Sequence, residues 1–212
     1  MLSFSPAAPS PRRVSSTSDS TREAILDAAL TLFSTKGFAS STTKEIAARA
    51  GVAEVTLFRH FVSKENLFQE LLMSRSFVVE LGSLLGELEE LPCSEAVTIL
   101  ATRLFDALMT YRDWIVVMHG EIRRFPELLV PSYHRFLDAL FGTLADFFRG
   151  RQLRGELRSS FDPEFAARAL HGMVFCLFNV EELLGRKEYR PVDRSQAIHS
   201  FVDLLLEGMV VR

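Results

Sequence analysis

Hydrophobic residues recur every three to four positions along most of the chain, which is the spacing of amphipathic α-helices. The first such segment covers 20–36, where Ser20 and Glu23 form the sequence pattern of a capping box. Gly37 follows the last apolar position and is placed to end the helix, because glycine adopts the left-handed conformation at low cost.

The stretch TTKEIAARAGVAEVTLFRHF, which begins at Thr42, predicts two short helices joined at Gly51. Thr42 with Glu45 forms a second capping pair. Ala47, Gly51 and Leu57 have the spacing of a helix-turn-helix: a small residue at the crossing, a turn and an apolar plug. Such a unit can present its second helix to the major groove of DNA.

The remaining chain has the same helical pattern without strand-like alternation, so the sequence predicts an all-α fold of about nine helices. Pro126 and Pro131 are expected to separate two helices, 150–160 is expected to be a loop, and Asp162-Pro163 and Asp193 are expected to begin helices. The helices are expected at 20–36, 42–50, 54–60, 63–90, 94–110, 113–125, 131–149, 163–185 and 193–210.

Composition bounds the class of protein. The 212 residues are 48% hydrophobic, enough for a sizeable core, but no apolar run approaches the ~20 residues of a membrane span. Residues 1–18 are rich in Ser and Pro and lack the apolar stretch of a secretion signal, so we expect a disordered tail and a cytoplasmic protein. The net charge of −3 is not that of a nonspecific DNA-binding protein.

Candidate catalytic and metal-binding patterns are missing from the sequence. The five His are scattered, Cys93 and Cys176 are far apart, and no GxSxG, HExxH or phosphate-binding glycine loop occurs. We therefore expect no enzyme activity, no metal site and no cofactor.

Residues 21–72, TREAILDAALTLFSTKGFASSTTKEIAARAGVAEVTLFRHFVSKENLFQELL, resemble the N-terminal domain of the TetR family of transcriptional regulators. The resemblance implies a DNA-binding domain over 19–66 and a helical ligand-binding and dimerisation domain over 67–212, with a double-stranded DNA operator as partner. It implies that the DNA-contacting residues are Thr42, Thr43, Lys44, Glu54, Val55, Thr56, Arg59, His60 and Lys64.

The chain departs from the family pattern at three positions. It has Ala53 where many members have a capping Ser or Thr, Glu54 where many have a basic residue, and Phe58 where a phosphate-binding Tyr is common. A weaker electrostatic grip on DNA is expected. Glu54 could accept a hydrogen bond from a cytosine amino group, and Val55 could touch a thymine methyl group.

The central helices carry many large apolar residues, which are either plain core or the lining of a cavity for a small hydrophobic or aromatic effector. Polar anchors in such a cavity would be His119, Arg123, His171, Asn179 or Glu181. The ligand-binding residues are predicted to be Phe105, Met109, Trp114, Met118, Phe125, Tyr133, Phe136, His171, Phe175 and Phe178.

The last two long helices are apolar over more of their circumference than a surface helix needs. The resemblance implies a homodimer in which these helices pair with their symmetry mates. The predicted interface residues are Leu170, Met173, Val174, Leu177, Phe201 and Leu205.

The sequence therefore predicts a ligand-responsive regulator, most simply a repressor, that binds a palindromic operator as a homodimer and is released by an apolar effector. An all-helical interaction protein whose helix-turn-helix no longer binds DNA is the alternative, and Glu54, Phe58 and the acidic net charge favour it.

Overall fold

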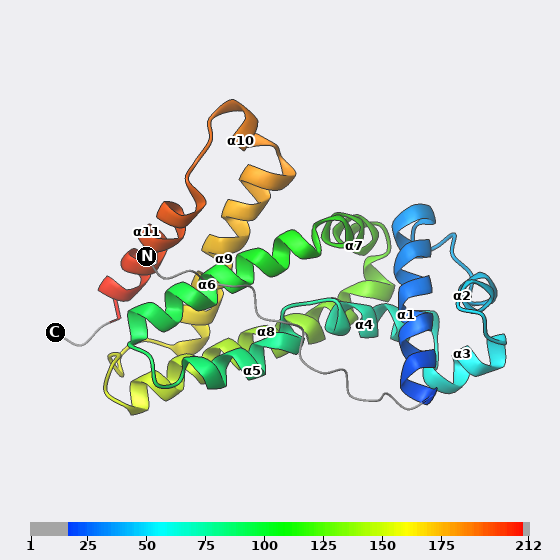
Figure 1. The fold of residues 1–212 in the computed structure, drawn as a ribbon, viewed down its shortest axis with the longest axis horizontal. Helices are drawn as coiled ribbons and strands as arrows, with labels where there is room; N and C mark the ends of the chain where they lie inside the picture. The colour runs from blue at the N-terminus through cyan, green and yellow to red at the C-terminus, as the bar shows by residue number, and fades with distance from the viewer. Residues whose placement is uncertain (1–16, 210–212) are drawn as a thin grey trace, which may run out of the picture.

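The computed structural model describes residues 17–209, which form an elongated, all-helical molecule (Figure 1). Helices α1–α3 lie at one end, α5, α6, α8 and α9 form the body, and α11 packs against α6 and α9 at the other end. The helices are α1 Thr17–Lys36, α2 Thr43–Arg49, α3 Glu54–His60, α4 Lys64–Ser74, α5 Val78–Leu88, α6 Cys93–Thr110, α7 Arg112–Arg124, α8 Pro126–Leu153, α9 Pro163–Phe178, α10 Arg186–Tyr189 and α11 Arg194–Glu207, with a π-helix η1 at Asn179–Leu183.

The all-α prediction is confirmed over the described residues. Of the predicted tail, residues 1–16 lie outside this range and residues 17 and 18 belong to α1. Because α1 already includes Thr17, Ser20 lies within the helix, so the predicted Ser20–Glu23 capping box at its start is wrong. Among the described helices none is long and apolar enough to cross a lipid bilayer.

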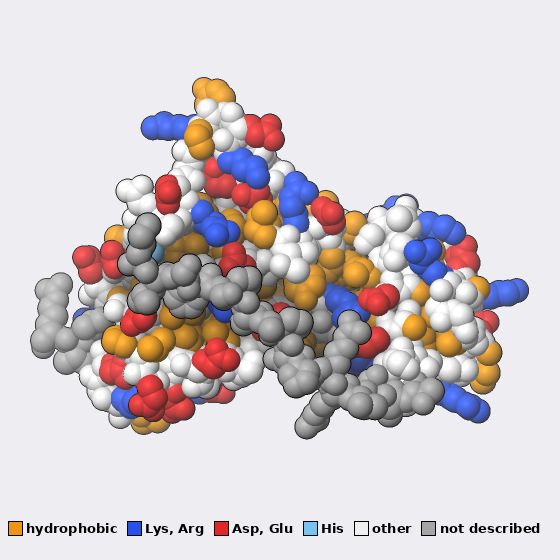
Figure 2. Space-filling model, in the orientation of Figure 1, with side chains coloured by type: hydrophobic (Ala, Val, Ile, Leu, Met, Phe, Trp, Pro, Cys, Tyr) orange, Lys and Arg blue, Asp and Glu red, His pale blue; other side chains and the backbone are white. Residues whose placement is uncertain are grey.

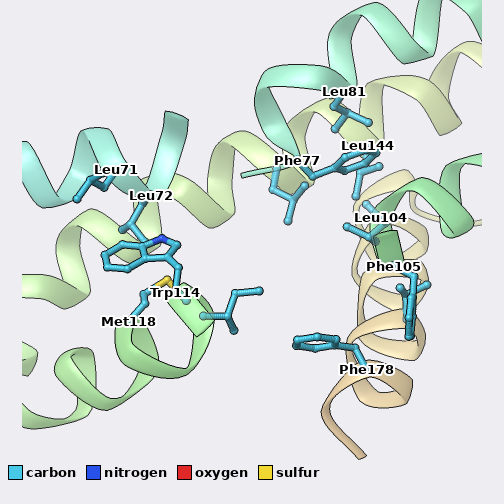
Figure 3. Close-up of a cluster of buried hydrophobic side chains, with 14 of the residues drawn as sticks. Leu71, Leu72, Phe77, Leu81, Leu104, Phe105, Trp114, Met118, Leu144 and Phe178 are labelled. Carbon is cyan, nitrogen blue, oxygen red and sulfur yellow. The ribbon is translucent and has the colours of Figure 1, made fainter. Parts of the chain in front are cut away.

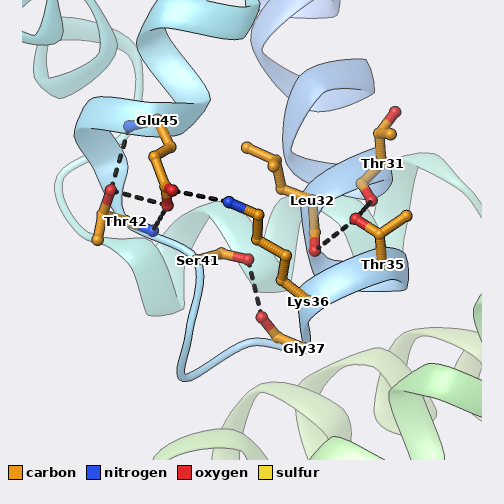
Figure 4. A network of polar contacts seen from close by, with 8 residues as sticks. All are labelled: Thr31, Leu32, Thr35, Lys36, Gly37, Ser41, Thr42 and Glu45. Atoms are coloured by element: carbon orange, nitrogen blue, oxygen red, sulfur yellow. Dashed lines mark hydrogen bonds and ion pairs between the residues drawn. The ribbon is translucent and has the colours of Figure 1, made fainter.

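The junction between α1 and α2 is held by a polar network (Figure 4). Thr42 accepts a hydrogen bond from the Glu45 N–H, and the Glu45 carboxylate accepts one from the Thr42 N–H, which confirms the predicted capping box. Lys36 Nζ lies 2.8 Å from Glu45 Oε1. These contacts lower the pKa of the Glu45 carboxyl to about 2, the bond from Lys36 being the largest cause. The entry of α2 is thereby tied to the end of α1.

The helix-turn-helix forms as its three key residues predict. Ala47 and Leu57 are fully buried between α1, α2 and α3, and Gly51 has a φ of +71°, which is accessible to glycine at low cost. Helix α3 begins after Ala53, whose side chain makes no capping hydrogen bond. Ser63 caps α4 by accepting from the Asn66 N–H, as expected.

The expected single helix over 63–90 is wrong, because the chain breaks at 75–77 into α4 and α5. Arg75 leaves helical geometry with φ −107° and ψ 48°. The break lets the Arg75 guanidinium reach α1 while Phe77 becomes buried in the body. The ion pairs of Arg75 and the burial of Phe77 thus outweigh the continuous helical pattern of this segment.

Helix α8 is longer than predicted at both ends. Pro126 occupies its first turn and Pro131 lies within it, exposed, so Pro131 does not begin a new helix. At the other end α8 runs into the expected loop 150–160, because Arg151 is buried and needs helical placement. Its guanidinium donates to the carbonyl oxygens of Leu88 and Leu91, both at 2.7 Å.

The predicted helix 163–185 ends at Phe178 as an α-helix and continues as the π-helix η1. Gly185, with φ +68°, then ends η1 and precedes the short α10. Asp162 and Asp193 cap α9 and α11 as predicted, by accepting from the N–H groups of Glu164 and Gln196.

Candidate nucleic-acid interface and effector cavity

Helix α3 presents one apolar side to the protein and a mixed side to solvent. Leu57 is fully buried, whereas Val55 is 62% and Phe58 47% exposed, and Arg59 is exposed as well. Thr56 and His60 are partly exposed beside them. The outward side of α3 therefore carries an apolar contact group, a hydroxyl and a guanidinium, which are the groups that read base edges and phosphates.

Exposed cations surround this surface, although the whole chain is acidic. Between Lys36 and Lys64 the sequence has five Lys or Arg against two Glu. Lys44 and Arg49 on α2 and Arg59 on α3 are exposed, and Figure 2 shows Lys and Arg side chains projecting from the end that α1–α3 form in Figure 1. The local positive charge would attract the negatively charged phosphates of DNA.

Glu54 and Thr43 are bonded to each other across the α2–α3 junction. The Thr43 hydroxyl donates to Glu54 Oε1 at 2.6 Å, and both residues are partly buried. Glu54, at the position where many TetR-family members have a basic residue, thus connects α3 to the start of α2. Thr42, by contrast, is exposed and already serves as the α2 cap.

Lys64 is turned toward the protein. Its ammonium donates to the carbonyl oxygens of Phe38 at 2.9 Å and Ser41 at 3.1 Å, and it lies 4.4 Å from the centre of the Phe38 ring. These contacts hold the α1–α2 loop against α4. A phosphate contact by Lys64 stays a prediction that requires the ammonium to leave these carbonyls.

A cavity of about 230 Å³ lies between α4–α5, α6, α7, α8 and α9. Figure 3 shows Leu72, Trp114 and Met118 on one side of it and Phe77 and Leu104 on the other. It is lined by Leu72, Arg75, Ser76, Phe77, Val78, Leu104, Ala107, Leu108, Tyr111, Trp114, Ile115, Met118, His119, Tyr133, Phe136, Leu137, Leu140, Phe141, His171 and Phe175.

Six of the ten predicted ligand-binding residues line this cavity: Trp114, Met118, Tyr133, Phe136, His171 and Phe175. The other four do not. Phe105 and Phe178 pack edge to face in the core at 6.2 Å, Phe125 faces Phe38 of the DNA-binding end, and Met109 lines a separate, more open hollow beside α1. The helical periodicity predicts that a residue is buried, but it does not predict whether the residue lies in the packed core or in the wall of a cavity.

Of the five proposed polar anchors, His119 and His171 reach the cavity. Arg123 is exposed, Asn179 lies in η1, and Glu181 is buried with its Oε2 atom lacking a hydrogen-bond partner among the described residues. Arg75 and its neighbours Ser76, Phe77 and Val78 were missed, because the sequence pattern conceals the helix break that turns them inward.

Burial favours the uncharged forms of His119, Tyr133 and His171 in the cavity. It lowers the pKa of His171 to about 4, and it lowers the pKa of His119 with a further contribution from Arg123. Burial also raises the pKa of the Tyr133 hydroxyl. At neutral pH the cavity therefore presents two neutral imidazoles and a phenol.

Arg75 and Glu121 are among the residues that connect the cavity helices to the DNA-binding end. Arg75, which lines the cavity, donates to Glu23 at 2.9 Å and to Asp27 at 2.6 Å, both on α1. Glu121, on the same helix as the cavity residue Met118, accepts a hydrogen bond from the Phe38 N–H at 2.6 Å. Arg75 thus ties the cavity to Glu23 and Asp27 within α1, and Glu121 on α7 ties it to the loop that follows α1.

The predicted dimer residues are mostly part of the protomer's own core. Leu170, Val174, Leu177 and Leu205 are buried, and Met173 and Phe201 are partly buried against that core. The outward sides of α9 and α11 instead carry Phe165, Gly172, Cys176 and Leu204, of which Phe165 is 71% and Leu204 67% exposed. Both helices carry apolar residues on more than one side, so the sequence pattern could not separate the inner side from the outer.

Two family models cover most of the chain. The model of bacterial regulatory proteins of the tetR family matches residues 25–71, and that of the AefR-like transcriptional repressor C-terminal domain matches residues 100–208. The HTH-type transcriptional regulator SrpR of Pseudomonas putida is 36% identical over 205 residues, covering 92% of this chain and 90% of SrpR.

Solved structures show the same fold. The crystal structure of a protein from Mesorhizobium loti assigned to the TetR family has a TM-score of 0.68 at 23% identity, covering 93% of this chain and all of that one. The flavonoid-responsive regulator FrrA has a TM-score of 0.67 at 25% identity, covering 91% and 98%. With these family matches and the identity to SrpR, the chain belongs to the TetR family of bacterial transcriptional regulators.

Proposed function

We propose that this regulator is a homodimeric repressor that binds a palindromic operator through α2 and α3 and is released when a small, largely apolar effector enters the cavity. The observation that carries the proposal is the sharing of elements between the two sites: α7 and Arg75 both line the cavity and hold α1. An effector that displaces either one changes the position of the DNA-binding end.

The DNA contacts that we propose come from Thr42, Lys44, Val55, Thr56, Arg59 and His60, which are exposed or partly exposed on one end of the molecule. Thr43 and Glu54 are proposed to act as a bonded pair, because the hydroxyl proton of Thr43 is directed to the carboxylate. Because Thr43 bonds to Oε1 alone, the second carboxylate oxygen of Glu54 is left to accept a hydrogen bond from a cytosine amino group while the pair is intact.

Repression is supported by the match to an AefR-like transcriptional repressor domain over 100–208. A response to an apolar effector is supported by the cavity lining and by the flavonoid response in the name of FrrA, which has the same fold. Because the effector can shift the balance only by its preference for one conformation, a hundredfold preference corresponds to about 2.7 kcal/mol.

The dimer that we propose uses the outward sides of α9 and α11, centred on Phe165, Gly172, Cys176 and Leu204. Phe165 and Leu204 are large, apolar and exposed, so a symmetry mate could cover them, whereas Leu170 and Val174 could reach a partner only if the protomer opened. A two-fold axis there sets two α3 helices apart, and an operator of two half-sites requires a spacing of about 34–36 Å.

A binding selection from genomic fragments tests the proposal. Recovered fragments should share an inverted repeat whose half-sites lie about one helical turn apart. Affinity should fall steeply with added salt, because phosphate contacts release counterions. Recovery of no common sequence, together with salt-insensitive binding of a protein partner, would instead support a helical interaction protein.

A further inference from the structure

Six rings form a continuous wall along the cavity, which we call the ring wall. It consists, in spatial order, of Phe136, Tyr133, His119, Phe175, His171 and Phe141, with neighbouring ring centres between 5.4 and 6.0 Å apart. The rings come from α7, α8 and α9, and all of them line the cavity. Such a wall offers faces and edges on which another flat ring can stack.

Three members of the ring wall carry polar atoms that are not used within the protein. His119, Tyr133 and His171 make ring contacts, but no hydrogen bond joins their side chains to another group in the described part of the chain. All three residues are only partly buried, so their polar atoms are open to a ligand or to water. The ring wall therefore has spare capacity to donate and accept hydrogen bonds.

The cavity offers no free charge to an ionic ligand. Arg75 is its one charged lining residue in the described range, and the guanidinium already contacts two carboxylates, those of Glu23 and Asp27. Because burial keeps both imidazoles neutral, neither supplies a positive charge at neutral pH. A carboxylate or ammonium group would enter without a free counter-charge, which is costly in an apolar site.

The size of the cavity limits the number of rings. A cavity of about 150 Å³ is sufficient to hold benzene. The volume of about 230 Å³ found here accommodates a larger aromatic molecule of one or two rings.

We propose that the effector is an uncharged phenol with one or two aromatic rings, which stacks on the ring wall and exchanges hydrogen bonds with His119, Tyr133 and His171. This inference rests on the proposed function, since it names the chemical class of effector for the same cavity. The three polar residues are specificity-determining, because they distinguish a hydroxylated ring from a bare one.

Three compounds that share one two-ring skeleton test the inference by calorimetric titration of the full-length protein without DNA. They are 2-naphthol, naphthalene and 2-naphthoate. We expect 2-naphthol to bind at least ~10-fold more tightly than naphthalene, the difference that about one hydrogen bond makes, and 2-naphthoate to bind most weakly. Equal affinity of naphthol and naphthalene, tightest binding of naphthoate, or no binding of naphthol would overturn the proposal.

Substitutions that replace one ring by another show which residue causes the preference for 2-naphthol over naphthalene. Tyr133→Phe, His119→Phe and His171→Phe keep the stacking surface and remove the polar atoms. At least one of them should lower the affinity for 2-naphthol toward that for naphthalene while leaving naphthalene binding unchanged. If all three folded variants keep the wild-type preference, the ring wall does not select the hydroxyl group. The compound series on the unmodified protein gives its answer even if a variant fails to fold.

The operator assay separates this inference from the proposed function. If the protein binds its operator but does not prefer 2-naphthol to naphthalene, only the phenol proposal is refuted. Tight naphthol binding that leaves the operator complex intact would instead show that the cavity ligand is not an inducer.

Discussion

The carboxylate of Glu121 accepts a hydrogen bond from the backbone N–H of Phe38 across a separation of 83 residues, at 2.6 Å and out of contact with solvent. Glu121 lies on the helix that forms one wall of the cavity, whereas Phe38 lies where α1 turns toward the DNA-binding helices. The ring of Phe38 also packs against Phe68 of α4 and Phe125 at the end of α7. The carboxylate of Glu121 is thus one of the groups that hold the DNA-binding end on the body.

Glu121→Ala should lower both stability and operator affinity. The substitution leaves the buried Phe38 N–H without an acceptor, at a cost of about 1–3 kcal/mol. Glu121→Gln retains an acceptor oxygen and should behave closer to the wild type. Thermal unfolding and operator titration provide the measurements, with the exposed Glu127→Ala as control. An Ala variant as stable as this control would show that the bond does not hold the two parts together.

Gly37→Ala should destabilise the protein more than Gly51→Ala does. Both glycines have positive φ, 81° and 71°, so both substitutions incur backbone strain of about 1–2 kcal/mol. At Gly37 the new Cβ would also lie 3.0 Å from Glu121 Oε1, whereas at Gly51 it meets nothing within 4 Å. The difference in unfolding free energy isolates the contact with Glu121. Equal losses would mean that the carboxylate moves aside without cost.

Arg59→Ala should weaken operator binding by about 1–3 kcal/mol without changing the melting temperature. Arg59 is exposed and makes no ion pair with the other described residues, so its removal disturbs no internal contact. If Arg59 contacts phosphate, the slope of log affinity against log salt should also become shallower by ~1. Operator titration at several salt concentrations measures both effects.

Lys64→Met is the informative comparison for Arg59, because Lys64 bonds to Phe38 and Ser41 carbonyl groups. Loss of stability with an unchanged salt slope would assign Lys64 to the loop. A shallower slope at unchanged stability would restore the predicted phosphate contact.

Stability should fall as the pH is lowered from 6.5 toward 4 because of His171. The pKa of this imidazole is about 4 in the folded protein against 6.5 in the unfolded chain, so the unfolded chain takes up the proton first. The contribution is complete above pH 6.5 and has decreased by about 2 kcal/mol at pH 5. Melting temperatures at pH 7.5 and pH 5 should differ by several degrees less in His171→Phe than in the wild type. An identical pH dependence of both proteins would refute this assignment.

Leu204→Asp should dissociate the dimer and abolish tight operator binding. Leu204 is 67% exposed on the outward side of α11, so the substitution places a charge on the proposed seam without disturbing the protomer's core. Leu128→Asp is the matched control, because Leu128 is also an exposed leucine but lies in the first turn of α8, at the end that follows α7. Sedimentation measures the mass of both variants, and a dimeric Leu204→Asp protein would exclude this seam.

Local capping and turn chemistry made the DNA-binding end predictable from sequence. Thr42 with Glu45, Gly51 and Ser63 each act within a few residues along the chain, so their roles can be read from spacing alone. The same holds for Asp162 and Asp193. Their interactions do not depend on how distant helices pack.

Contacts between distant segments were not predictable in the same way. The turn at Arg75 accompanies contacts with two carboxylates about 50 residues earlier, and the extension of α8 accompanies bonds from Arg151 to carbonyl groups about 60 residues earlier. Likewise, the inner and outer sides of α9 differ only in what packs on them: Leu170 is buried while Phe165 is not. A single sequence specifies which residues are apolar but not which neighbour covers each.

Trp114 is the single tryptophan of the chain, and it lies in the wall of the cavity with its ring 5.4 Å from that of Phe68 on α4. The tryptophan fluorescence of the unlabelled protein therefore arises at the place where an effector would bind and where the body meets the DNA-binding end. Entry of a small molecule and the movement that follows can be timed separately by mixing protein with compound, then protein with operator, and recording the same emission.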